Sequence, residues 1–197
     1  MPAATATFAD KPTLTGDRVV LRPFVESDLP ALAAAVADPE VGRLTGSVHS
    51  TAELGQPHDP ERLREWYLTR GEQDDRLDLA IVDRASGECV GEAVLNEWEP
   101  ENDACNFRIL IGPGGRDRGL GTDATRLILG HAFEALGLHR VSLEVYAFNP
   151  RGLRAYQKAG FVHEGVRRDA LRFDGEYVDS HLMSVLAREW EQHRGRP

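Results

Sequence analysis

Arg116-Asp117-Arg118-Gly119-Leu120-Gly121-Thr122 is the stretch around which the fold is organised. It lies between a predicted strand at 104–111 and a predicted helix at 124–136. A turn that leads into a helix aims several backbone N–H groups at one place, beside the partial positive charge of the helix N-terminus. The two glycines can adopt positive φ and approach a bulky group closely, and the two arginines add charged donors. The stretch therefore indicates an anion-binding turn, although two turn glycines also occur in ordinary loops.

The composition of the chain fits one domain with a sizeable core. The chain has 197 residues, of which 41% are hydrophobic and 28% charged. We expect an N-terminal extension over residues 1–12, a single domain over 13–190 and a polar C-terminal tail over 191–197. No run approaches the about 18 apolar residues of a membrane span, and the first residues lack the order of a signal peptide, so we expect a cytoplasmic protein without a membrane partner.

Charge and cysteine usage exclude further classes of partner. The net charge of −9 argues against a nucleic-acid partner and slightly favours an amine or another cationic small molecule. The two cysteines, Cys89 and Cys105, lie in apolar strand-like stretches without metal-ligand spacing. Buried, reduced thiols are the simplest interpretation, and we expect no metal site.

The order of the predicted elements indicates a mixed sheet. These elements are a strand at 13–24, helices at 28–37 and 60–70, strands at 77–82, 88–97 and 104–111, a helix at 124–136, a strand at 140–146, a short helix after Asn149, and strands at 161–173 and 177–186. The strand at 140–146 is reached by a helical crossover and should run parallel to the strand at 104–111. Residues 42–60 form a long stretch without periodicity, and such a loop is usually functional or disordered.

Two better-known phosphate-binding turns do not match this chain. A P-loop requires Gly-Lys-Ser/Thr, but Gly121 is followed directly by Thr122. A dinucleotide-binding turn requires G-x-G-x-x-G within repeated parallel units, which the predicted order of elements does not provide.

A third pattern does match. The chain resembles the GNAT superfamily of acyl-CoA-dependent N-acetyltransferases, whose turn Q/R-x-x-G-x-G/A fits residues 116–121. The superfamily pattern N-x(6)-Y-x-K-x-G-F fits Asn149, Tyr156, Lys158, Gly160 and Phe161. The closing stretch at 160–190 looks like that of the RimJ/RimL-type branch, so the resemblance covers roughly residues 14–190.

This resemblance implies an α/β (α+β) fold of the GNAT type. The expected sheet is mixed, mostly antiparallel and twisted, with about seven strands, a splayed parallel pair and about four flanking helices. The resemblance also implies acetyl-CoA as cosubstrate, with the pyrophosphate on the backbone N–H groups of 118–122 and Arg116 free to reach a phosphate oxygen. It assigns cofactor contacts to Leu110, Ile111, Arg116, Arg118, Gly119, Leu120, Gly121, Thr122, Asn149 and Lys158.

The function implied is transfer of an acyl group, in the first place acetyl, to a primary amine. The amine of a small molecule or of a peptide N-terminus would attack the thioester directly. Similar enzymes use the tyrosine at the position of Tyr156 as the general acid for the leaving thiolate. Its alternative role is to pack its ring on Leu153 and Ala159. Asn149 can cap its helix and bind cofactor at once.

The general base is less defined by the sequence. Glu97 ends the strand that pairs with 104–111 and is the candidate nearest the acceptor, but it could also be one of several acids in an exposed turn. Glu92 and Asp103 are weaker candidates. Members of the branch that modify ribosomal proteins often carry serine where this chain has Gly152, which weighs against that specificity.

Two alternatives remain open at this point. The chain could be an acyl-CoA-binding sensor or interaction protein with little turnover, because no base is identified. We also expect a homodimer formed through the closing hairpin, whose apolar residues Val178, Leu182, Met183 and Val185 exceed the needs of one buried face. The alternative is a monomer in which these side chains pack internally.

Overall fold

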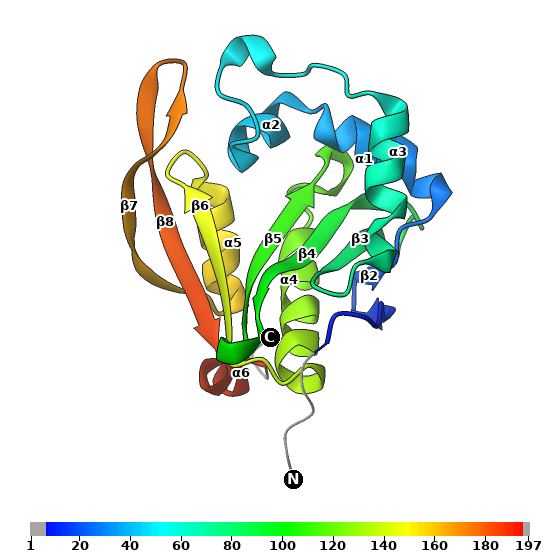
Figure 1. Ribbon diagram of the computed structural model, residues 1–197, viewed down its shortest axis with the longest axis vertical. Helices are drawn as coiled ribbons and strands as arrows, with labels where there is room; N and C mark the ends of the chain where they lie inside the picture. Colours follow the sequence, from blue (N-terminus) through cyan, green and yellow to red (C-terminus); the bar gives the residue numbers. More distant parts are fainter. Residues whose placement is uncertain (1–6, 195–197) are drawn as a thin grey trace.

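A single mixed sheet of eight strands forms the centre of the molecule (Figure 1). The computed structural model describes residues 7–194, and its strand order is β1-β2-β3-β4-β5-β6-β8-β7. The strands are β1 Leu14–Thr15, β2 Val19–Arg22, β3 Leu77–Asp83, β4 Cys89–Glu99, β5 Ala104–Ile111, β6 Arg140–Tyr146, β7 Val162–Phe173 and β8 Glu176–Leu186. Every neighbouring pair is antiparallel except β5 and β6. The prediction of a mixed, mostly antiparallel sheet is confirmed, with β1 and β2 replacing the single strand expected at 13–24.

Helices cover both faces of this sheet. They are α1 Leu29–Val36, α2 Pro39–Thr45, α3 Pro60–Leu68, α4 Leu120–Gly130, α5 Pro150–Ala159 and α6 Ala187–His193. The alternation along β3 shows the division: Leu79 and Ile81 join the large core with α4, whereas Ala80 and Val82 join a smaller cluster with α1 and α3. All seven residues of β3 are therefore buried, as in a strand covered on both faces.

The parallel pair β5–β6 is short and then diverges (Figure 1). Its register comprises Ala104↔Arg140, Cys105↔Val141 and Asn106↔Ser142. Beyond these residues the two strands separate, while β5 stays paired with β4 and β6 stays paired with β8. The splayed pair implied by the sequence is confirmed. The facing edges of 107–111 and 143–146 carry backbone groups that do not pair with each other.

Helix α2 was not predicted, because it is only seven residues long. Pro39–Thr45 extends into the aperiodic stretch 42–60 and shows too few turns for a periodic pattern. Its ends do carry signals: the Asp38 carboxylate accepts a hydrogen bond of 3.0 Å from the Val41 N–H, and Gly46 ends the helix at φ 65°.

The described part of the N-terminal extension packs against the domain. Phe8 is fully buried, and its ring meets Trp98 edge-to-face with centroids 5.4 Å apart. The Lys11 ammonium donates hydrogen bonds of 2.5 to 2.6 Å to the carbonyl oxygens of Phe8, Gln73 and Arg76. Residues 7–12 therefore contribute to the core that the sequence assigned to 13–190, and residues 1–6 lie outside the described part.

The C-terminal end is more ordered than we expected from its polar sequence. The polar tail that we expected over 191–197 is helical at its start, because α6 continues to His193. Trp190 anchors this helix: its side chain is buried, and its indole N–H donates a 2.8 Å hydrogen bond to Glu134. Residues 195–197 of the expected tail lie outside the described part.

The cysteines, the closing hairpin and the helix lengths each bear on an expectation from the sequence. Cys89 and Cys105 are buried free thiols, as predicted, and burial raises the pKa of Cys89 to about 11 and that of Cys105 to about 12. In the closing hairpin, Met183 and Val185 are buried in the large core, so internal packing accounts for them. Over residues 7–194, no helix has the length and apolar character that crossing a membrane requires.

Candidate functional site

A cavity of about 580 Å³ occupies the gap between β5 and β6. Helix α2, the turn before α4, the start of α4 and one side of α5 complete its wall. Most of the site residues predicted from the sequence line it: Glu97, Leu110, Ile111, Arg116, Gly119, Gly121, Thr122, Asn149, Tyr156 and Lys158. Arg118 and Leu120 are not part of the lining. The divergence of the two strands thus creates the space that the predicted residues share.

The glycines of the turn differ in their roles. Gly119 is the N-cap of α4 and has φ 76°, so it requires the left-handed conformation. Gly121 lies in the first turn of α4, where the expected positive φ is wrong. A Cβ at Gly121 would lie 3.4 Å from the Ile111 side chain. The absence of a side chain at Gly121 therefore leaves space in the cavity wall. Leu120 is buried beneath the turn and holds this end of the helix in the core.

The N-terminus of α4 supplies donors to the cavity. The first N–H groups of a helix have no partner within the helix. Here the first helical hydrogen bond runs from the Asp123 N–H to the Gly119 carbonyl, at 3.1 Å. The N–H groups that precede it belong to Leu120, Gly121 and Thr122, and the last two of these residues line the cavity. Together with the helix dipole they form a site that suits an anion.

The two arginines of the turn are engaged elsewhere. Arg116 donates to Asp38 at 2.5 Å and to Glu40 at 2.8 Å, and only 13% of its side chain is exposed. The expectation that Arg116 is free to reach an anion is therefore wrong for this structure. Arg118 turns away from the cavity and pairs with the buried Asp83 at 2.7 Å. The backbone donors, and not these two side chains, face the cavity without carboxylate partners.

Tyr156 combines a packed ring with an available hydroxyl. Helix α5 begins at Asn149, whose side-chain oxygen accepts a 2.8 Å hydrogen bond from the Gly152 N–H. The Tyr156 ring meets Phe107 and Phe161 edge-on, with centroids 6.3 Å and 5.9 Å apart. Within residues 7–194 its hydroxyl has no hydrogen-bond partner, and burial raises its pKa to about 12. The hydroxyl is consequently protonated at neutral pH and can donate a proton into the cavity.

A β-bulge places Glu97 in the cavity wall. The register between β4 and β5 shifts between Asn96 and Glu99, and Glu97 has φ 51°. The other two candidates for a base are excluded by position. Glu92 is buried and does not line the cavity, and Asp103 lies in the turn before β5, also outside the lining.

Several residues of β5 and β6 line the cavity although they were not predicted as site residues. Asn106 and Arg108 of β5 and Glu144 and Tyr146 of β6 all face the cavity. Their alternation at every second position of a strand was visible in the sequence. Their bordering of a cavity depends on the divergence of β5 and β6, which also brings Phe107 and Val145 of the opposite face to the lining.

A set of hydrogen bonds around Thr51 and Asp174 forms a feature that we call the tip bridge. Thr51 donates through its N–H and its hydroxyl to Asp174, at 2.8 and 2.5 Å, and the His49 ring lies 3.1 Å from the Arg172 carbonyl oxygen. These contacts join the segment after α2 to the turn of the β7–β8 hairpin. Beside them, the Arg43 guanidinium lies over two aromatic rings, those of Phe148 and Phe173. Part of the aperiodic stretch 42–60 is thus joined to the β7–β8 hairpin.

Comparisons with known proteins agree with this architecture. Residues 18–162 match the model of the acetyltransferase (GNAT) domain. The chain is 24% identical to the SPbeta prophage-derived uncharacterized N-acetyltransferase YokL of Bacillus subtilis, over 92% of this chain and 97% of that protein. It is 28% identical to the spermidine N(1)-acetyltransferase of Vibrio cholerae, over 54% of this chain and 61% of that protein. The crystal structure of a GCN5-related N-acetyltransferase from Brucella melitensis matches with a TM-score of 0.78 and 25% identity, covering 98% of this chain and 87% of that one.

The Asp38–Arg116 pair should give a pH-dependent stability. Burial acts to raise the pKa of Asp38, but hydrogen bonds from Arg116 and the Val41 N–H outweigh it and lower the pKa below the ordinary 3.8. A lowered folded-state pKa stabilises the fold above 3.8 and loses this effect as the pH falls through the folded value. Asp38→Asn keeps a helix cap, so at pH 7 it should cost about 1–3 kcal/mol of unfolding free energy through the charge pair alone. Urea unfolding of both proteins should show this difference shrinking below pH 3.8; a constant difference would contradict the assignment.

Proposed function

We propose that this chain, which belongs to the GNAT acetyltransferase family, transfers an acetyl group from acetyl-CoA to a primary amine by direct attack. The observation that carries the proposal is the coincidence of three features in one cavity. These are an unpaired strand edge, the free N-terminal donors of α4 and the available hydroxyl of the half-buried Tyr156. Each feature supports a different part of the reaction.

The cosubstrate fits the residues that surround the gap. The unpaired edge of β5 can hydrogen-bond an extended pantetheine arm as an added strand would, past Leu110 and Ile111. The N-terminal donors of α4 suit its pyrophosphate, and Asn149 and Lys158 lie on the α5 wall of the same cavity. Arg116 would reach a phosphate oxygen only by exchanging Asp38 and Glu40 for it.

The chemical step then needs three contributions from the protein. The amine attacks the thioester carbon, and a backbone N–H of β5 stabilises the oxyanion that forms. As the carbon–sulfur bond breaks, the Tyr156 hydroxyl gives its proton to the thiolate. Glu97, directly or through a water molecule, accepts the proton that the amine loses. The products are the acetylated amine and free CoA.

The acceptor is proposed only by class: a small-molecule amine or the N-terminus of a peptide. The closing stretch at 160–190 supports the RimJ/RimL-type branch, whereas Gly152 weighs against ribosomal proteins as acceptors. A similar protein is named for spermidine, but that name belongs to a relative which aligns over 61% of its length. The class of acceptor therefore has to be inferred from the residues that line this cavity.

Replacing Gly119 with valine should weaken binding of the cosubstrate. A β-branched residue is strained at φ 76°, and its Cβ would come within 2.8 Å of the Arg18 guanidinium. The displaced turn should raise the KM for acetyl-CoA by about tenfold or more, since left-handed strain costs about 1–2 kcal/mol. Gly137→Val is the matched control: Gly137 also has positive φ, 70°, but nothing lies near its Cβ position and it does not line the cavity. Calorimetry that shows equal CoA affinity for both folded variants would refute the turn as the phosphate site.

Tyr156→Phe tests the catalytic role against the packing role. Phenylalanine keeps the ring contacts with Phe107 and Phe161 and removes only the hydroxyl. CoA binding should be retained, while kcat falls by roughly a hundredfold, the usual scale for a general acid. Release of free CoA thiol from acetyl-CoA, followed across a panel of amines, measures both proteins. A fall of less than about threefold would return Tyr156 to packing, and CoA binding without turnover on any amine would favour a sensor.

We further propose a symmetric homodimer that uses the β7–β8 hairpin. Although Met183 and Val185 pack internally, Val162, Val166 and Tyr177 of the same hairpin are between 45% and 64% exposed. Light scattering at micromolar concentration should give about twice the 21.8 kDa of one chain. A single-chain mass up to the highest soluble concentration would exclude the dimer.

A further inference from the structure

Arg108 is a cation at the acceptor side of the cavity that the proposed reaction does not use. It lies on β5 between Phe107 and Ile109, which both contact the large core, so its side chain emerges on the opposite face, toward α1 and α3. Its side chain is 45% exposed and lines the cavity together with Asn106, the residue two positions earlier.

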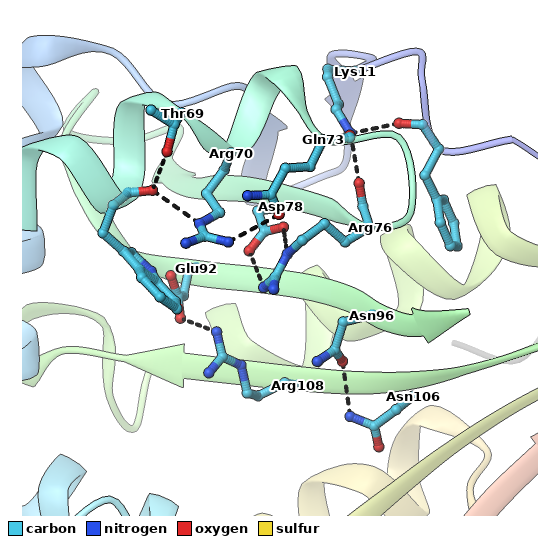
Figure 2. A network of polar contacts seen from close by, with 12 residues as sticks. Lys11, Thr69, Arg70, Gln73, Arg76, Asp78, Glu92, Asn96, Asn106 and Arg108 are labelled. Atoms are coloured by element: carbon cyan, nitrogen blue, oxygen red, sulfur yellow. Dashed lines mark hydrogen bonds and ion pairs between the residues drawn. The ribbon is translucent and has the colours of Figure 1, made fainter. Parts of the chain in front are cut away.

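One buried carboxylate holds Arg108 in place (Figure 2). The Glu92 side chain, on the neighbouring β4, is only 6% exposed and accepts a 3.1 Å hydrogen bond from Nη2 of Arg108. Burial raises the pKa of Glu92 in spite of this cation, so the carboxylate holds its negative charge weakly. Within residues 7–194 this is the one hydrogen bond of the guanidinium, which leaves most of its five N–H donors available to the cavity.

The carboxylates in the same part of the wall do not neutralise Arg108. Glu144 accepts hydrogen bonds from Arg167, at 2.6 Å, and from the Ser180 hydroxyl, so its charge is already paired. Glu97 forms no ion pair in the described part of the chain and remains available for an amine. On the strand side of the wall, Glu97 is thus a carboxylate without an ion partner among the described residues and Arg108 an incompletely paired guanidinium, while Arg154 and Lys158 are the cations that α5 adds to the lining.

The spacing of these two groups corresponds to a short acceptor. Asn106 pairs directly with Asn96, the residue before Glu97, and Arg108 lies two residues further along β5. Arg108 itself pairs with Val94, three residues before Glu97 on β4, so the two backbone positions are about 10 Å apart along the strand. The long side chains of Glu97 and Arg108 can reach toward each other over part of this distance, which leaves a gap of about two extended peptide units. An amine beside Glu97 and an anion beside Arg108 can therefore belong to one small molecule.

We propose that Arg108 binds a carboxylate of the acceptor, so that the enzyme prefers an amine that also carries a carboxylate, of amino-acid or dipeptide size, over a polyamine. The inference rests on the proposed function and deepens it. A guanidinium recognises a carboxylate through two parallel hydrogen bonds. A polyamine would instead place a second cation against Arg108.

The test compares a dipeptide with its C-terminal amide, glycyl-leucine with glycyl-leucinamide. The amide removes the negative charge and keeps the reacting amine. Calorimetry on the CoA-loaded protein and initial rates with acetyl-CoA should both favour the acid, by about tenfold or more, the scale of a charged hydrogen bond. Arg108→Gln should reduce the acid-to-amide ratio to about one without changing the KM for acetyl-CoA. Arg108→Lys should retain part of the preference, because the positive charge remains while the paired N–H donors of the guanidinium are lost.

Two control variants separate recognition from stability. Glu92→Gln keeps Arg108 and the volume of its partner, so the preference for the acid should persist. If Arg108→Gln unfolds because the buried Glu92 has lost its cation, the double variant Arg108→Gln/Glu92→Gln restores an uncharged pair and should fold with no preference.

Several results would overturn the proposal. These are equal binding of acid and amide by the unmodified protein, binding of neither, a preference for spermidine over the dipeptide, or a raised acetyl-CoA KM in Arg108→Gln. None of these results would affect the proposed acetyl transfer itself, which is judged separately by CoA binding and by thiol release with other amines.

Discussion

The early end of the β5–β6 pairing is the constraint on which the rest of the structure depends. After Asn106 and Ser142 each strand keeps only its outer neighbour, so the inner edges present unpaired backbone groups to the gap. Such groups are stable only when they are hydrated or when a ligand pairs with them. The seven-residue pairing of β6 with β8 holds the second strand in its divergent position. The sheet thereby keeps a place for an additional strand-like molecule.

Charged groups around the gap are sorted by whether the protein has already paired them. Arg116, Arg118 and Glu144 have ion partners of their own. The donors of the α4 N-terminus, the Tyr156 hydroxyl and most of the Arg108 guanidinium lack protein partners among residues 7–194. Glu97, Arg154 and Lys158 also line the cavity and form no ion pair within the described residues, so the cavity offers unpaired groups of both charges.

Local patterns in the sequence predicted residues that the structure brings together in one cavity, and contacts between distant segments account for lining residues and ion pairs that were not predicted. The turn at 116–122 and the spacing from Asn149 to Tyr156 each lie within one strand-turn-helix or helix unit, so their residues could be read together. The pairing of Arg116 with Asp38 joins residues that are 78 positions apart. The local sequence around either residue does not indicate it. The order of strands was predictable for the same local reason, since alternation and turn residues define each strand. Helix α2 was too short to show a helical period of apolar residues. The burial of Phe8 depends on a core that later segments of the chain complete.

The tip bridge has a consequence for the mobility of the second half of the sheet. It joins the segment after α2 to the β7–β8 turn through His49 and Thr51, while the short pairing of β5 with β6 joins the two halves of the sheet elsewhere. Because β6 is paired with β8 along its whole length, the hairpin and β6 should move together. The hydrogen bonds of the tip bridge thus act as a second tie between the two sides of the gap.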